Sequence, residues 1–234
     1  MGKVLIASGT AFGFWIGSAA WALDFTLDPA IDEFTSSDTT AGASVVQDPN
    51  NPRTITFTIP DKVAARAEIR RVSQASGPQE MGGTFELTNE AGDFLSIIQA
   101  LNVKARNKPT GSSEPVAQLG IRKTGDLANV GGEMRASYEF YIEQQSGKPT
   151  CAALGTFTPG EAVAIVMSFD KDAWPVFTRD GDSAKTCTGG KPDRLMGDPS
   201  GNSRGTFYYY GKLGVYKTNS GIGSAQVLWT GVFD

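Results

Sequence analysis

Hydrophobic and polar residues alternate in short runs along most of this chain, and no stretch keeps a helical period. Alternation with a period of two, carried by β-branched and aromatic residues, is typical of half-buried strands. The pattern predicts strands at TITFTIP, ARAEIRRV, GTFELT, FLSIIQALNVKA, VAQLGIRK, ASYEFYIEQ, AVAIVMSFD, GTFYYYGKLGVYK and AQVLWTGVFD. Turn-forming residues separate these runs, for example in DPNNP, TPGE and DGD.

Strands at this spacing predict an all-β fold, a concanavalin A-like jelly-roll sandwich of two antiparallel sheets. We expect one domain over residues 23–234 with little helix, because DPAIDEF is the only helix-like stretch. The segment from Ser183 to Arg204 looks like a long loop over a sheet edge. Trp174 and Trp229 are most simply core residues, although Trp174 beside a proline also suits a stacking platform for a sugar ring.

Residues 1–22 have the pattern of a cleaved signal peptide. Lys3 precedes a long apolar run, and Ala20 and Ala22 give the small-x-small ending that signal peptidase recognises. A membrane anchor is the alternative, since the run is long for a signal core, but no basic stop follows it. We therefore expect a secreted protein, extracellular or periplasmic, with no membrane segment after cleavage.

Export changes the interpretation of the two cysteines. In an oxidising compartment Cys151 and Cys187, the only pair, are able to form one disulfide, and two free thiols are the alternative. The chain has no histidine, which excludes a Ser-His-Asp triad and the usual zinc sites. We expect no cofactor and no metal ligands.

Net charge limits the partners. Removing residues 1–22 takes away one basic and no acidic residue, which leaves 20 basic and 25 acidic side chains in the mature chain, a net charge of −5. Such a chain has no general attraction to nucleic acid or anionic membranes, so an anionic ligand requires a local cluster of Arg and Lys. We expect a monomer.

Three strands carry polar side chains on one face. In ARAEIRRV, the residues Arg66, Glu68 and Arg70 alternate with small and apolar residues. Taken alone, such alternating charges more commonly form an exposed ladder of salt bridges. In SIIQALNVK, Gln99 falls on the side of Ile97 and Leu101, and by itself such a residue is more often a hydrogen-bonded core amide than a ligand.

The third strand, YYYGKLGVYK, places two phenols and an ammonium around a glycine, at Tyr210, Lys212, Gly214 and Tyr216. We interpret the glycine as space for a bulky group to approach the backbone. A polar ligand against this face would explain the pattern.

These three stretches resemble the active-site strands of known enzymes. RAEIR resembles the Arg-x-Glu-[Leu/Val/Ile]-Arg strand of the alginate lyases in polysaccharide lyase family seven, and IIQAL resembles their Gln-Ile-His strand. YGKLGVY resembles their Tyr-Phe-Lys-Ala-Gly-x-Tyr strand and is the most specific match. The related jelly-roll glucuronan lyases have similar strands, and the order along the chain is the same.

The resemblance implies β-elimination on an acidic polysaccharide such as alginate or glucuronan. Donors neutralise the uronate carboxylate, a base removes the C5 proton, and an acid protonates the departing glycosidic oxygen. A tyrosine is able to act as the acid, and beside Lys or Arg also as the base. The implied catalytic residues are Tyr216, Tyr210, Gln99 and Arg66, and the implied substrate-binding residues are Arg70, Glu68, Lys212 and Lys104.

The chain departs from this family at the histidine of the second motif, which aligns with Leu101. Either a tyrosine serves as both base and acid, or the substrate requires only a syn route, or the protein kept the groove and lost the reaction. The alternative function is therefore a non-catalytic module that binds acidic glycans. A third is a structural envelope protein of the same fold.

Overall fold

The computed structural model describes residues 34–75, 80–92, 94–102, 115–144, 151–169, 175–184, 207–217 and 223–233. Every element in these ranges is a strand. The described residues include no helix that is long and apolar enough to cross a membrane. The signal-peptide prediction lies outside them.

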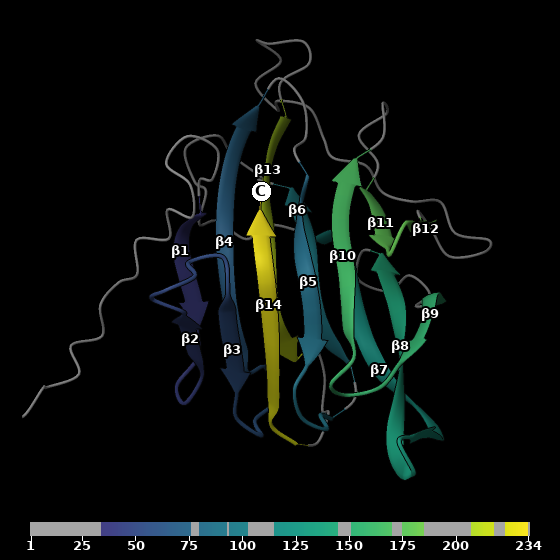
Figure 1. Cartoon of the computed structure of the whole chain (residues 1–234). Coiled ribbons are helices and arrows are strands. Elements are labelled where there is room, and N and C mark those ends of the chain that lie inside the picture. Colours follow the sequence, from purple (N-terminus) through teal and green to yellow (C-terminus); the bar gives the residue numbers. More distant parts are fainter. Residues whose placement is uncertain are drawn as a thin grey trace, which may run out of the picture.

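Two antiparallel sheets lie face to face (Figure 1). The first sheet has the order β1-β4-β13-β6-β7-β8-β9. Its strands are β1 (Phe34–Thr39), β4 (Arg66–Ala75), β13 (Phe207–Lys217), β6 (Leu95–Asn102), β7 (Pro115–Val130), β8 (Glu133–Gln144) and β9 (Cys151–Phe157).

The second sheet has the order β12-β11-β10-β5-β14-β3-β2. Its strands are β12 (Asp182–Ala184), β11 (Pro175–Arg179), β10 (Ala162–Phe169), β5 (Met81–Leu87), β14 (Ala225–Phe233), β3 (Ile55–Ile59) and β2 (Ser44–Gln47). Figure 1 shows this sheet in front, with the carboxyl-terminal strand β14 near its centre.

The core lies between the two sheets and is built by strict alternation. In β3, buried Ile and Phe side chains alternate with half-buried threonines. Phe85 of β5 joins the two layers, because its ring meets Trp229 of the same sheet and both Phe140 and Phe157 of the other edge-on, at 5.4–6.2 Å between centroids. Trp229 is fully buried, as the sequence predicted.

The all-β, two-sheet fold is confirmed, and each of the nine expected strands overlaps an observed one. Five strands were not expected, namely β1, β2, β9, β11 and β12. Four of these form the edges of the two sheets, where a strand has a neighbour on one side only and its sequence shows little of the hydrophobic alternation that marks an interior strand. Phe34, the last residue of the helix expected at DPAIDEF, begins β1, and the other residues of that stretch lie outside the described ranges.

Candidate functional site

The three strands that carry the motifs are distant in sequence and adjacent in the first sheet, where β13 lies between β4 and β6. Lys212 lies opposite Arg70 of β4 on one side and Gln99 of β6 on the other. Tyr216 lies opposite Arg66. Directly opposed residues of antiparallel strands point to the same face. The sheet therefore gathers these side chains on the face opposite the core.

Glu68 is at the centre of this group. Its carboxylate oxygen Oε1 accepts a hydrogen bond from Gln99 Nε2 at 2.5 Å. The other oxygen, Oε2, lies 3.2 Å from Lys212 Nζ and 3.1 Å from Arg66 Nε. Glu68, Gln99 and Lys212 are all nearly buried, at 2%, 4% and 6% exposure. A buried carboxylate requires such partners, so the interaction fixes the positions of the amide and the two cations.

In this cluster two cations, Arg66 and Lys212, face the carboxylate of Glu68. Arg70 lies on the same face, and Asp38 of β1 lies opposite Glu68. The alternative of an exposed ladder is wrong for Glu68, which is enclosed between β13 and the side chains around it. Positive charge on a partly buried surface is what binding of a carboxylate requires.

Arg66 also contacts the tyrosine predicted to act in catalysis. Its guanidinium carbon lies 4.5 Å from the centroid of the Tyr216 ring, within the range of a cation–π contact. The Arg66 side chain is 31% exposed and Tyr216 is half-buried. A phenol and a guanidinium therefore lie together at the solvent-facing side of the cluster.

A β-bulge at Gly214 sets the position of Tyr216. Between the pairs Leu213↔Ile98 and Tyr216↔Ser96, strand β13 has one residue more than β6. Gly214 has φ +147°, and a Cβ there would lie 2.3 Å from the backbone oxygen of Ala67. The glycine is thus required by the neighbouring strand β4, and the interpretation that it leaves space for a ligand is wrong.

A second bulge changes the neighbours of Gln99. Strand β6 has an extra residue at Ile97 relative to β7, between the pairs Ser96↔Gly120 and Ile98↔Leu119. Ile97 joins the hydrophobic core together with Ile98. Gln99 therefore shares its face with Ser96, and the expectation that it lies on the side of Ile97 fails because period-two counting does not continue through a bulge.

The end of β13 is fastened next to Tyr216 by a buried lysine. Lys217 is fully buried, and its Nζ donates to Asp61 Oδ1 at 3.0 Å and to the Gly223 carbonyl at 3.1 Å. Its backbone N–H donates to the Ala65 carbonyl at 3.0 Å. The hydrogen bond from the Gly223 N–H, and then that from Lys217, hold the pKa of Asp61 below its usual 3.8.

No protein-family model and no curated protein matches this chain. Solved structures do match its fold. The endo-β-1,4-glucuronan lyase of the fungus Trichoderma reesei superposes with a TM-score of 0.54 at 13% identity, over 87% of this chain and 92% of that one. An alginate lyase of Pseudomonas aeruginosa gives a TM-score of 0.52 at 12% identity, over 80% and 83%. This is the jelly-roll fold of the polysaccharide lyases. The fold that the three motifs implied is confirmed.

In the first sheet, the polar face continues from β6 onto β7 and β8, where the sequence analysis named no site residue. Gln118 lies opposite Gln99 and donates to Glu143 Oε2, and Arg122 Nε bonds to Glu139 Oε1. The signal was present, since QLGIR and EFYIE carry polar residues at every second position. This alternation identifies an outward-facing side of each strand. It does not show that this side adjoins the Glu68 cluster.

Between these pairs, Tyr141 lies over Gly120 on the same outward face of the first sheet. A Cβ on Gly120 would lie 2.4 Å from Tyr141 Cζ, so the tyrosine ring occupies the place where a side chain would stand. Ser96 lies opposite Gly120, and its hydroxyl is buried. Between the Glu68 cluster and the polar pairs of β7 and β8, the outward face of the sheet is therefore packed by the Tyr141 ring and by the small residues Gly120 and Ser96.

Several predicted site residues lie wholly or partly outside the described ranges. Tyr210 pairs through its backbone with Val72 and Leu101, but its side chain is not among those described. Lys104, Trp174 and Cys187 lie outside these ranges, as does the side chain of Cys151, so the disulfide stays a prediction. Within the described part of the chain, no three His, Cys, Asp or Glu side chains gather closely enough to hold a metal ion.

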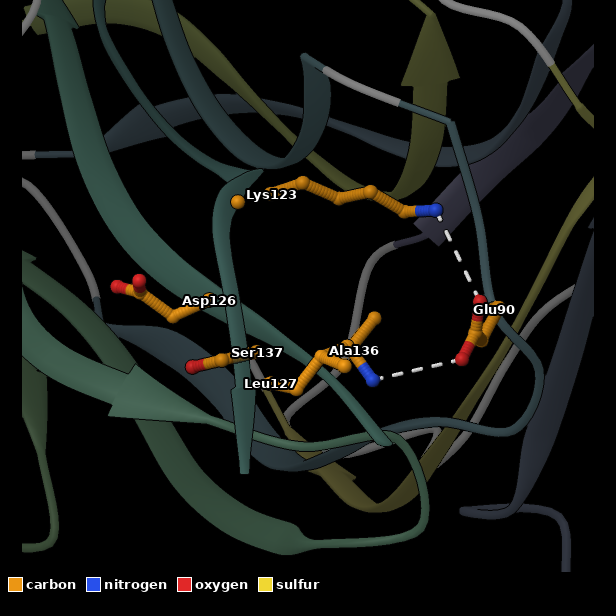
Figure 2. Close-up of a pocket in the computed structure, with 7 residues that line it drawn as sticks. Glu90, Lys123, Asp126, Leu127, Ala136 and Ser137 are labelled. Carbon is orange, nitrogen blue, oxygen red and sulfur yellow. Dashed lines mark hydrogen bonds and ion pairs between the residues drawn. The ribbon is translucent and has the colours of Figure 1, made fainter. Parts of the chain in front are cut away.

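A small pocket of about 220 Å³ lies away from this cluster, at the β7–β8 hairpin (Figure 2). Its lining includes Glu90, Lys123, Asp126 and Ala136 and none of the predicted site residues. Glu90 lies 3.8 Å from Lys123 Nζ and accepts from the Ala136 N–H at 3.4 Å. Because none of the predicted site residues lines it, the pocket is a weaker candidate than the cluster around Glu68.

Proposed function

We propose that this protein is an exported polysaccharide lyase that cleaves a uronate-containing glycan by β-elimination. The observation that carries the proposal is the convergence of Arg66, Lys212, Gln99 and Tyr216 from three strands around one buried carboxylate, Glu68. The fold supports it, because the solved structures that share it include an endo-β-1,4-glucuronan lyase and an alginate lyase.

In the proposed reaction, Arg66, Arg70 and Gln99 bind the uronate carboxylate. Their donors stabilise the enolate-like charge that develops when the C5 proton leaves. Tyr216 removes that proton and returns it to the glycosidic oxygen at C4, so the C4–O bond breaks as the C4–C5 double bond forms. Lys212 adds positive potential, and Glu68 holds the donors in place through its contacts with them.

A module that binds acidic glycans without cleaving them is the second candidate. The observation in its favour is Leu101 at the position of the family's histidine, in a chain that contains no histidine. The two candidates share the cationic cluster and differ in whether Tyr216 transfers a proton.

The test is to incubate the purified mature chain separately with alginate, polymannuronate, polyguluronate and glucuronan, and to follow the ultraviolet absorbance of the unsaturated uronate. A lyase gives a rise with one polymer or more. Tyr216→Phe should abolish this rise while polymer binding persists, and Arg66→Ala should weaken binding. Lys62→Gln removes a lysine that is exposed and outside the cluster, and it should change neither.

If the folded chain gives no product with any polymer and still loses affinity in Arg66→Ala, the binding module replaces the lyase. If neither product nor binding is seen, both are rejected. Export has a separate test, because mass spectrometry of the protein recovered outside the cytoplasm should show a chain that begins at Leu23.

A further inference from the structure

The outward face of the first sheet is a continuous polar row that crosses from the Glu68 cluster to the strands beyond it. Lys212, Gln99, Gln118 and Glu143 lie opposite one another in turn on β13, β6, β7 and β8. With strands about 4.8 Å apart, Lys212 and Glu143 are separated by roughly 14 Å across the sheet. A glycan that lies over these strands therefore covers both ends of the row.

The two ends of this row have opposite charge. Over β4 and β13, three cations (Arg66, Arg70 and Lys212) share the face with Glu68, and Asp38 of the adjoining β1 lies opposite Glu68, so cations outnumber carboxylates there by one. Over β7 and β8, one cation, Arg122, shares the face with Glu139 and Glu143.

Arg122 is already paired with Glu139, and Glu143 accepts from the neutral amide of Gln118. Among the described residues, no cation pairs with Glu143. Further along β8, Glu133 and Arg135 pair with each other at 3.1 Å and cancel. The β7–β8 half of the face therefore repels a second carboxylate, whereas a sugar with hydroxyl or amide donors is able to bond to Glu143.

We propose that the substrate is a mixed acidic glycan, in which a uronate bound over β4 and β13 alternates with an uncharged sugar bound over β7 and β8. This inference rests on the proposed function and names the substrate class of that site. A homopolyuronate places carboxylates over both halves and is disfavoured by the acidic one.

The experiment compares two probes that share one uronate. Unsulfated chondroitin alternates glucuronate with N-acetylgalactosamine, and glucuronan contains glucuronate alone. At low salt we expect chondroitin to be bound and cleaved with a roughly tenfold lower KM, because one close charge repulsion near a surface is worth about that factor. The difference should shrink at high salt.

Glu143→Gln should lower the KM for glucuronan severalfold and leave the KM for chondroitin nearly unchanged. The substitution removes the repulsion between Glu143 and a second uronate carboxylate and keeps the shape of the side chain. Glu139→Gln should act in the same direction, since it leaves Arg122 free to bind a carboxylate. Glu86→Gln is the control, with the same substitution on the outward face of the second sheet, and should leave the ratio unchanged.

Preference for glucuronan, or a Glu143→Gln variant with an unchanged ratio, overturns the inference and leaves the proposed lyase standing. If no polymer yields unsaturated product, the proposed lyase fails, and equilibrium binding of the same two polymers decides the inference. Tighter binding of chondroitin that Glu143→Gln equalises supports it, and equal binding of both polymers by the unsubstituted protein overturns it.

Discussion

Replacing Gly214 with alanine tests whether the bulge in β13 is imposed by the neighbouring strand. At φ +147° a residue with a Cβ is strained, at a cost of about 1–3 kcal/mol. The new Cβ would lie 2.3 Å from Ala67 O and 2.8 Å from Glu68 Cα, which are backbone atoms of β4. Strand β4 has little freedom to move away, because it pairs with β1 on one side and with β13 on the other. Such overlap in a packed region costs a further ~1–3 kcal/mol. We expect Gly214→Ala to destabilise the fold by roughly 2–6 kcal/mol.

Gly125→Ala is the matched control, because Gly125 has φ +84° and no neighbouring atom within 4 Å of the new Cβ. It should cost only the backbone strain, about 1–2 kcal/mol. Urea unfolding followed by tryptophan fluorescence measures both. With an m-value of about 2 kcal/mol per molar urea, the two midpoints should differ by about 1 M. Equal midpoints would show that β4 yields to the methyl group and that the contact does not constrain the bulge.

Three further predictions concern the same sheet. Glu68→Gln should destabilise the fold by about 3 kcal/mol in urea unfolding, because the buried Lys212 loses its anion; a change under 1 kcal/mol would contradict this. Gly120→Ala should cost about 1–3 kcal/mol through its clash with the Tyr141 ring, and Tyr141→Leu in the same chain should recover part of that cost. The lowered pKa of Asp61 contributes stability above its usual 3.8 that is lost as pH falls through the folded-state pKa. Asp61→Asn should therefore be less stable than the unsubstituted protein at neutral pH, with the gap closing below about pH 4 in acid unfolding.

The sequence predicted the interior strands well because their alternation is imposed by the core that they face. In β4, the alternation of Arg66, Glu68 and Arg70 with Ala67 and Ile69 is the alternation of the two faces in the structure. The edge strands have core contacts on few residues, so their sequences carry little of this signal. The polar strand β1 is the clearest case, since its FTSSDT offers no hydrophobic period.

The bulges could not be read from a single strand. A bulge is a mismatch between two partners, so Ile97 and Gly214 each look like ordinary positions until the register with β7, β6 or β4 is known. Gly214 did mark an unusual position. The prediction that a ligand approaches the backbone there was wrong, because the neighbouring strand fills that space. In a sheet interior the closest body is usually the next strand, and here it is the backbone of β4.

The same limit applies to the site as a whole. Glu68 alone more commonly indicates an exposed salt-bridge ladder, and Gln99 alone an ordinary core amide. The difference is made by β13, which lies between their strands and brings Lys212 to the carboxylate that Gln99 also binds. The Glu68 carboxylate contacts one amide and two cations on the same face, and these contacts fix the positions of all three groups. The buried acid thus accounts for how a chain without histidine presents a preformed cationic site beside Tyr216.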